Sequence, residues 1–325
     1  MPRMSSTATP PLVTLDQIRA AAERIKPIAR RTPLVDVSTA AGWPLFLKCE
    51  SFQPGGAFKI RGAYNMVAQL TDDQRRRGVV TYSSGNHGQA LALAARELGA
   101  PAVVVMPTTA PAIKIEGVKS FGAEVIFAGT TSVERRTRAE QEADARGLTM
   151  VPPFDHEWII AGQGTVGTEI LEQQPDVAAV LVPIGGGGLA AGVAAAIKLT
   201  RPHVEVIGVE PSGAAAMKAS IDAGEPVTLD TTHSIADGLM PVRPGDLTFA
   251  HVCQFVNRIV TVDDAQIVQA VLWTFEKAKI VAEPSGAASI AAALAGATGT
   301  RGPVVAIVSG GNMSMERLEE LRCAR

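Results

Sequence analysis

Short β-branched runs alternate with helix-forming stretches along most of this chain of 325 residues. The clearest examples are "GVVTYSS" followed by "HGQALALAARELG", and "PAVVVMP" followed by "APAIKIEGVKSFG". The alternation continues through "AEVIFAG", "VAAVLVPIG", "VEVIGVE" and "GPVVAIVSGG". Apolar strands separated by helices are typical of parallel sheets that are covered by helices on both faces. The sequence therefore predicts an α/β protein with mostly parallel sheets.

The strand-helix series is most regular in residues 77–152, which we predict to form a small, mobile domain on the substrate side of the protein. Residues 1–76 and 153–325 then form a large domain from both ends of the chain. The first helix is expected within "TLDQIRAAAERI", where Thr14 and Gln17 have capping-box spacing. Ligands of open α/β sheets bind beyond the carboxyl ends of the strands, so the turns after the strands are the places to search.

Composition and charge narrow the class of protein. Charged residues make up 19% and the formal net charge is -2, which gives no electrostatic reason to expect a nucleic acid or a membrane surface as partner. No run of about 18 or more apolar residues occurs, so a membrane span is not expected. The cysteines lack C-x-x-C spacing, and the start of the chain lacks the apolar core of a signal peptide. We therefore expect a cytoplasmic protein without disulfides or structural zinc.

Three turns after predicted strands have glycines and small polar residues. The turn "YSSGNHGQ" at 82–89 opens a helix and could hold a carboxylate on its backbone N–H groups. The turn "PIGGGGLAAG" at 183–192 has four consecutive glycines, which let the backbone wrap around a phosphate, and "VSGGN" at 308–312 places Ser309 at the end of the last strand. The glycines match neither the Walker A pattern nor G-x-G-x-x-G, so a nicotinamide-dependent dehydrogenase is a poor interpretation.

Lys59 lies in "SFQPGGAFKIRGAYN", between small and apolar residues. A lysine held in an apolar site favours the neutral amine, which is the form that makes a Schiff base. A tetraglycine loop can hold a phosphate, and a serine can hydrogen-bond a ring nitrogen. Together these are the requirements for binding pyridoxal 5'-phosphate (PLP).

The same stretches resemble a known enzyme family. The motifs "GAFKIRGAYN", "SSGNHGQALALAA", "IAGQGTVGTEIL", "PIGGGGLAAG", "VEPSG", "IADGL", "VAEPSGAA" and "VSGGN" occur in the order found in fold type II PLP enzymes. They are most similar to the serine/threonine dehydratase and serine racemase group, and the similarity runs from about residue 15 to the end of the chain. The resemblance implies a two-lobed fold like that of the tryptophan synthase β-subunit.

The resemblance also implies a role for individual residues. Lys59 would form the Schiff base with PLP and move the proton at the substrate Cα. The other expected contacts with PLP are the ring faces at Phe58 and Gly238, the ring hydroxyl at Asn86, the ring nitrogen at Ser309, and the phosphate at Gly185, Gly186, Gly187 and Gly188. The residues expected around the substrate carboxylate are Ser83, Ser84, Asn86 and His87.

The implied reaction is an ammonia-lyase (dehydratase) reaction on a small β-hydroxy amino acid. L-threonine would give 2-oxobutanoate and ammonia, and L-serine would give pyruvate and ammonia. Ser84 resembles the second acid/base of serine racemases, and Arg135 resembles an arginine that these enzymes bring over the substrate. A serine racemase or a 3-hydroxyaspartate dehydratase therefore remains an alternative, as does a catalytically silent amino-acid-binding protein.

Two positions depart from the pattern of the family. Ala57 stands where many members have serine, and Ala216 stands where members that bind a divalent cation have an acid. Glu210 alone makes a weak site for a hard cation, so we predict no divalent metal and only a possible monovalent ion at Glu210. The family also leads us to expect a homodimer. No regulatory domain is expected after "VSGGN".

Overall fold

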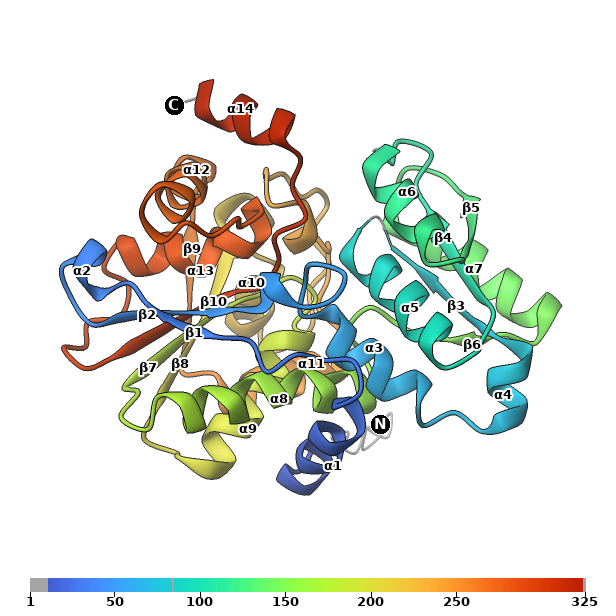
Figure 1. The fold of residues 1–325 in the computed structure, drawn as a ribbon, viewed down its shortest axis with the longest axis horizontal. Coiled ribbons are helices and arrows are strands. Elements are labelled where there is room, and N and C mark those ends of the chain that lie inside the picture. Colours follow the sequence, from blue (N-terminus) through green and yellow to red (C-terminus); the bar gives the residue numbers. More distant parts are fainter. Residues whose placement is uncertain (1–10, 84, 111, 324–325) are drawn as a thin grey trace, which may run out of the picture.

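The computed structural model describes residues 11–83, 85–110 and 112–323, which form two lobes side by side (Figure 1). One lobe is built on a six-stranded sheet and the other on a four-stranded sheet. We call the four-stranded sheet with helices α5 to α7 the small lobe, and the part built on the six-stranded sheet the large lobe. Mostly parallel sheets flanked by helices confirm the predicted fold class. The domain boundaries given above stay a prediction.

The sheet of the large lobe has the strand order β1-β2-β10-β7-β8-β9. Only β1 and β2 pair antiparallel, and the other neighbours pair parallel. The strands are β1 (Leu34–Asp36), β2 (Leu45–Cys49), β7 (Ala179–Pro183), β8 (Glu205–Pro211), β9 (Arg258–Val262) and β10 (Val304–Val308). The last strand of the chain, β10, is thus an inner strand between β2 and β7.

Alternate residues of β7 face two different layers of helices. Leu181 packs in a core cluster with α12 and α13, whereas Val180 and Val182 pack in a cluster with α8 and α9. Every residue of β7 and β10 is buried. A strand that is covered on both faces needs apolar residues at every position, which explains the continuous runs in the sequence.

The sheet of the small lobe has the order β5-β4-β3-β6, and all its pairs are parallel. Its strands are β3 (Val79–Tyr82), β4 (Ala102–Met106), β5 (Glu124–Phe127) and β6 (Thr149–Met150). Val104 packs on the side of α5 and α6, and Val103 packs on the side of α7. Its helices are α5 (Asn86–Glu97), α6 (Ala112–Ser120) and α7 (Ser132–Arg146), and α4 (Asp72–Arg77) precedes β3.

The remaining helices belong to the large lobe. They are α1 (Leu15–Ile25), α2 (Ser38–Ala41), α3 (Lys59–Val67), α8 (Glu157–Gln173), α9 (Gly188–Thr200), α10 (Ala216–Ala223), α11 (Asp246–Phe255), α12 (Asp264–Trp273), α13 (Pro284–Leu294) and α14 (Met315–Cys323). Short 3₁₀ helices are η1 (Glu50–Phe52), η2 (Ser212–Ala214) and η3 (Asp237–Leu239), and η4 (Thr274–Ala278) is a π-helix that continues α12. The predicted capping box of Thr14 and Gln17 is present at the start of α1. Within the described ranges, no helix combines the length and the apolar character that crossing a membrane requires.

Glycines let α8 pack closely against α3 and α9. A Cβ added at Gly162 of α8 would lie 2.6 Å from the Cα of Gly62 in α3. A Cβ at Gly192 of α9 would lie 2.3 Å from the carbonyl oxygen of Ile160. Any larger residue at these positions would push the helices apart, so the glycines of "IAGQGTVG" and "GGGGLAAG" set the position of α3 and of its first residue.

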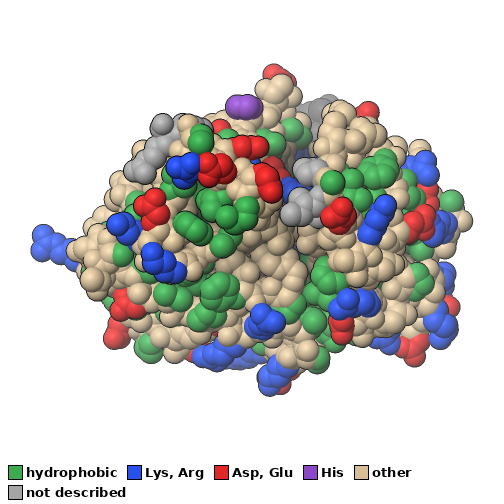
Figure 2. Space-filling view, turned by 45° about the horizontal axis from the view of Figure 1, so that its top comes forward, with side chains coloured by type: hydrophobic (Ala, Val, Ile, Leu, Met, Phe, Trp, Pro, Cys, Tyr) green, Lys and Arg blue, Asp and Glu red, His purple; other side chains and the backbone are tan. Residues whose placement is uncertain are grey.

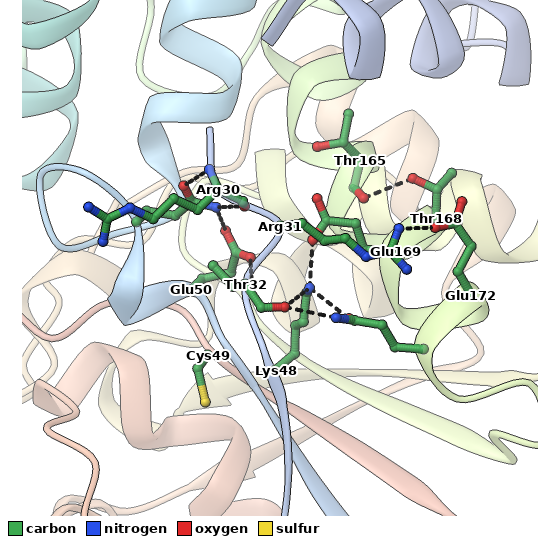
Figure 3. Close-up of polar contacts among 12 residues, drawn as sticks. Arg30, Arg31, Thr32, Lys48, Cys49, Glu50, Thr165, Thr168, Glu169 and Glu172 are labelled. Atoms are coloured by element: carbon green, nitrogen blue, oxygen red, sulfur yellow. Dashed lines mark hydrogen bonds and ion pairs between the residues drawn. The ribbon is translucent and has the colours of Figure 1, made fainter. Parts of the chain in front are cut away.

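A buried charge network, which we call the Arg61 network, ties α3 to β2, η1 and α8. Arg61 donates to both oxygens of Glu50 at 2.7 and 2.8 Å, and to both oxygens of Glu169 at 2.7 and 2.9 Å. Lys48 donates to Glu169 and to the carbonyl oxygen of Thr32, as Figure 3 shows. Burial alone would raise the pKa of Glu50, but the charge and hydrogen bonds of Arg61 hold that pKa below its ordinary value. The two cations and two carboxylates balance, so the interior keeps no unpaired charge here.

Part of the surface is apolar. Figure 2 shows hydrophobic side chains gathered in patches on the face that it draws. Several large hydrophobic side chains near the ends of α12 to α14 and η1 are exposed, namely Phe52, Phe275, Val281 and Met315. Val281 adjoins η1, because a Cβ at Gly311 would touch both the backbone of Val281 and the side chain of Ser51.

Candidate active site

Lys59 begins α3, directly after a glycine turn. Gly56 in that turn has a φ of 73°, and a Cβ on it would lie 2.1 Å from the side-chain oxygen of Asn312, so only glycine fits there. The Lys59 amine donates to the carbonyl oxygen of Pro153 at 2.7 Å and lies 5.1 Å from the centre of the Phe58 ring. Burial lowers the pKa of Lys59 from 10.5 to about 8. No carboxylate in the described ranges raises the pKa of Lys59, so its amine loses a proton far more readily than an ordinary lysine.

The four glycines follow β7 and open α9. Gly187, at the N-cap of α9, has a φ of 97°, and no side chain caps the helix. A Cβ at Gly186 would lie 2.3 Å from the ring of Phe154, and one at Gly188 would lie 3.0 Å from its Cβ. The Thr248 hydroxyl donates to the carbonyl oxygen of Gly186 at 2.6 Å and holds the loop in place. The uncapped N–H groups at the start of α9 therefore form a cradle suited to an anion.

Ser309 directly follows β10, beside the turn that leads to Lys59. The backbone N–H of Phe58 donates to the carbonyl oxygen of Ser309 at 3.1 Å. The buried Ser309 hydroxyl donates to the carbonyl oxygen of Ser285 at 3.4 Å, and the Ser285 hydroxyl accepts from the Gly238 N–H at 2.9 Å. Gly238 in turn adjoins the cradle, because a Cβ at Gly185 would lie 2.9 Å from the carbonyl oxygen of Gly238. Contacts thus connect four predicted positions from distant parts of the chain, namely Phe58, Ser309, Gly238 and Gly185, and Ser285 joins Ser309 to Gly238.

The small lobe contributes the start of α5. The Nε2–H of His87 donates to the carbonyl oxygen of Val151 at 3.1 Å, which leaves Nδ1 as a buried acceptor without a partner. Burial, and next the charge of Lys59, lower the pKa of His87 to about 3, so this side chain is neutral. The Ser83 hydroxyl accepts from the Gly85 N–H at 3.1 Å and shapes the turn. Gly85 leaves α5 without a side-chain cap, so a second helix start is open to an anion.

A family model for pyridoxal-phosphate dependent enzymes matches residues 25–310. The chain belongs to this family. It is 42% identical to an L-threonine ammonia-lyase of Thermotoga maritima over 95% of this chain and 78% of that protein. It is also 42% identical to a serine racemase of Oryza sativa subsp. indica, over 94% of this chain and 93% of that one. The recognised group, serine/threonine dehydratases and serine racemases, is thus confirmed.

Solved structures agree with this placement. The structure of maize serine racemase matches with a TM-score of 0.91 at 40% identity, over 97% of this chain and 98% of that one. The processed form of threonine deaminase isoform 2 from Solanum lycopersicum matches with a TM-score of 0.90 at 36% identity, over 99% and 93%. Both likenesses extend over nearly the whole chain, so the two lobes and their order belong to the family fold.

The residues present fit PLP. A phosphate needs backbone N–H groups without crowding side chains, and the cradle of α9 provides them, since its four glycines carry no side chain and the helix start is uncapped. An aldehyde needs an amine that loses its proton readily, and Lys59 has one. Both lie near Phe154, since Lys59 donates to the carbonyl oxygen of the residue before it and Gly186 adjoins its ring.

Two predicted substrate residues are not brought into the site by these contacts. Ser84 lies outside the described residues. Arg135, in the first turn of α7, donates to the carbonyl oxygen of Thr130 at 3.1 Å, and its buried Nε has no partner. Burial lowers the pKa of Arg135. Its expected contact with substrate stays a prediction.

The side chain of Glu210, at the end of β8, is hydrogen-bonded to the start of α10. Its two carboxylate oxygens accept from the N–H groups of Met217 and Lys218, each at 2.8 Å, at the start of α10. Burial raises the pKa of Glu210 to about 7. In the described part of the chain, no group of three or more histidine, cysteine, aspartate or glutamate side chains is arranged to hold a metal ion. A monovalent ion at Glu210 stays a prediction.

Sequence reasoning missed several residues of the site. Pro153 and Phe154 gave no signal, because a proline-proline-phenylalanine stretch is typical of an ordinary loop. Glu283 and Asn312 lay inside the motifs "VAEPSGAA" and "VSGGN" but received no role. In the structure Glu283 accepts from Asn86 at 2.5 Å, and Asn312 donates to Asn86 at 2.9 Å. These contacts join positions that are far apart along the chain, which spacing alone cannot reveal.

Proposed function

We propose that this protein is a PLP-dependent ammonia-lyase that converts L-threonine and L-serine to 2-oxobutanoate and pyruvate, with release of ammonia. The observation that supports it most is Lys59, an unpaired amine with a lowered pKa, beside the strand end that carries Ser309. A base for the substrate Cα and a neutral hydroxyl for the ring nitrogen are what β-elimination needs. The relatives named threonine ammonia-lyase support the same reaction.

Bound PLP supplies an aldehyde that captures the substrate amine and a ring that withdraws electrons from the Cα. The chain holds it through the groups described above. Backbone N–H groups of Gly185, Gly186, Gly187 and Gly188 would hold the phosphate, the Ser309 hydroxyl would meet the ring nitrogen, and Asn86 would meet the ring hydroxyl. Phe58 and Gly238 would contact the ring. Because the Ser309 hydroxyl is neutral, it favours early loss of a β-leaving group over accumulation of negative charge.

The side chains of the small lobe orient the substrate. The open N-terminus of α5 accepts the substrate carboxylate on its backbone N–H groups, including that of His87, and Ser83 and Asn86 flank it. Neutral Lys59 then takes the Cα proton, and the β-hydroxyl leaves with a proton as water. Hydrolysis of the released enamine adds one water and frees ammonia. The net products are therefore the 2-oxo acid and ammonia.

Serine racemase activity is the alternative with a specific observation behind it. Relatives named serine racemase match at the same 42% identity as the ammonia-lyase. A racemase needs a second acid/base on the face of the Cα opposite Lys59, and Ser84 is the residue we propose for it. If Arg135 reaches the substrate, 3-hydroxyaspartate becomes a further substrate.

We also propose that the protein is a cytoplasmic homodimer. The exposed apolar side chains of Phe52, Phe275, Val281 and Met315 support a protein interface on the large lobe. Size-exclusion chromatography with light scattering tests the dimer.

The test of the proposed function measures 2-oxo acid and D-isomer release together. L-threonine, L-serine and 3-hydroxyaspartate are each given to the wild type and to Lys59→Ala. We expect oxo acid to exceed D-isomer for L-threonine and L-serine. Lys59→Ala should lose roughly 10²–10⁴-fold or more of turnover with an unchanged circular dichroism spectrum. Turnover retained by Lys59→Ala would refute the proposal, and D-serine as the main product would favour the racemase.

A further inference from the structure

Glu283 has an unusual position for a carboxylate. It is the N-cap residue of α13, is buried, and makes no side-chain bond to its own helix. Its Oε1 instead accepts from the side-chain Nδ2 of Asn86 at 2.5 Å. Asn86 begins α5 in the small lobe, whereas Glu283 belongs to the large lobe. The contact therefore joins the two lobes at the site.

Gly310, the residue after Ser309, leaves the space that the Glu283 carboxylate occupies. A Cβ added at Gly310 would lie 2.0 Å from the Glu283 Oε1, so any other residue would displace the carboxylate. The backbone N–H of Glu283 donates to the carbonyl oxygen of Gly310 at 3.1 Å, which fixes the start of α13 against the end of β10. Glu283 is thus held beside the strand end expected to meet the ring nitrogen.

The Asn86 amide is fixed from both ends. Its Oδ1 accepts from Asn312 Nδ2 at 2.9 Å, and the same Asn312 nitrogen donates to the carbonyl oxygen of Gly55 at 2.8 Å. An ionised carboxylate only accepts, so Glu283 forces the Nδ2 end of Asn86 to face it. One Nδ2–H of Asn86 is then left for another acceptor. The ring oxygen of PLP is the acceptor that the proposed role of Asn86 provides.

Other charged groups face Glu283 from both lobes. Asp237 of η3 and Lys114 of α6 form an ion pair across the lobes, and Lys114 also adjoins Gly85. Burial, and next the charge of Asp237, raise the pKa of Glu283 to about 7, and the Asn86 hydrogen bond and Lys114 offset part of the rise. Two groups of the small lobe, the Asn86 amide and the Lys114 amine, therefore favour the ionised form of Glu283, and they do so only while the lobes are together.

We propose that Glu283 is a positioning residue which, when ionised, orients the Asn86 amide toward the ring hydroxyl of PLP and holds the small lobe against the large lobe. The proposal rests on the proposed role of Asn86 in cofactor binding, and it does not depend on which substrate is turned over. Glu283 itself touches neither PLP nor substrate in this role.

The test measures PLP affinity of the apo protein from pH 5.5 to 8.5, by quenching of tryptophan fluorescence, for wild type, Glu283→Gln and Glu283→Ala. Glutamine keeps an acceptor for Asn86 but cannot ionise. The ratio of wild-type to Glu283→Gln affinity cancels the titration of PLP itself. We expect this ratio to rise about tenfold as the pH increases through 7, because hydrogen bonds to a charged acceptor are stronger. Glu283→Ala should bind PLP at least about tenfold more weakly than Glu283→Gln at every pH.

Two further measurements keep the outcome unambiguous. Lys114→Met removes the cation that offsets Asp237, so the pH at which the ratio rises should move upward. Circular dichroism of each variant establishes that it is folded. A ratio that stays constant with pH, or equal PLP affinity of Glu283→Ala and wild type, would overturn the proposal. Neither result bears on oxo acid release, which tests the reaction separately.

Discussion

The Arg61 network and the contact region between the lobes both bury charged side chains, but they treat them in opposite ways. In the Arg61 network two cations meet two carboxylates, and every charge is shared by several hydrogen bonds. Between the lobes, among the residues that the structure describes, Lys59 has no carboxylate partner and the Glu283 side chain has only an amide. In the network the charge of Arg61 holds the pKa of Glu50 below its ordinary value, although burial lowers that of Lys48, whereas between the lobes burial moves the pKa values of Lys59 and Glu283 toward neutrality. The comparison distinguishes buried ionisable groups that stabilise the fold from those that lie at the candidate active site.

The largest effect should come from breaking the network. Arg61→Met leaves the buried Glu50 and the partly buried Glu169 without their main partner, which should lower the free energy of unfolding by about 3–5 kcal/mol. Urea denaturation of the apo protein measures it. Lys59→Met is the matched control, because it removes a cation from the same helix without leaving an unpaired carboxylate. Equal destabilisation by both variants would remove the distinction between the two regions.

The next largest effect should come from a substitution in the anion cradle, although the cradle holds no charged side chain. Gly186→Ala places a Cβ 2.3 Å from the Phe154 ring, and the forced shift should cost about 1–3 kcal/mol of stability. PLP affinity should fall roughly tenfold or more, as the uncapped N–H groups move away from the phosphate. Fluorescence titration with PLP measures this. Adding Phe154→Ala should relieve the contact and recover part of the affinity, and a double variant as weak as the single one would contradict the steric explanation.

The lowered pKa of Lys59 predicts a smaller, pH-dependent effect. Between pH 8 and 10.5 the unfolded chain binds a proton at Lys59 that the folded apo protein does not. Wild-type stability should therefore rise with pH, by on the order of 1–2 kcal/mol relative to Lys59→Met over the first part of that window, from pH 8 to about 9.5. Denaturation of both proteins at several pH values checks it. Parallel pH curves for the two proteins would mean that the amine has an ordinary pKa.

An exposed ion pair gives the smallest effect. Lys218 pairs with Asp222 at 2.8 Å on the surface of α10, with side chains 43% and 65% exposed. Lys218→Ala should change the free energy of unfolding by less than about 0.5 kcal/mol. A loss as large as that of Arg61→Met would show that burial is not what distinguishes the network.

The strands that are buried on both faces could be predicted from the sequence. The runs that became β4, β7 and β10 are apolar at every position, and those that became β3 and β8 have apolar cores, which few other structures require. Strand β2 could not be recognised in this way, because Lys48 interrupts its apolar run. That lysine is buried only because Glu169, 121 residues later, accepts from it.

The residues of the site also differ in whether a local sequence pattern could predict them. Lys59, the four glycines and Ser309 stand in turns that carry a local signal. Glu283 contacts Asn86 across 197 residues of chain, and Pro153 contacts Lys59 across 94. A local sequence pattern therefore cannot predict either contact. Resemblance to the family supplied roles only for positions that its motifs single out.

The inner position of β10 in the large sheet has a consequence for folding during translation. The four strands of the small lobe, all within residues 79–150, leave the ribosome early and can pair while translation continues. The large sheet must wait, because its inner strand is made last and β2 and β7 cannot be joined before residue 304 arrives. Until then the nascent chain exposes two unpaired strand edges, which are templates for aggregation. A premature stop before β10 would make that exposure permanent.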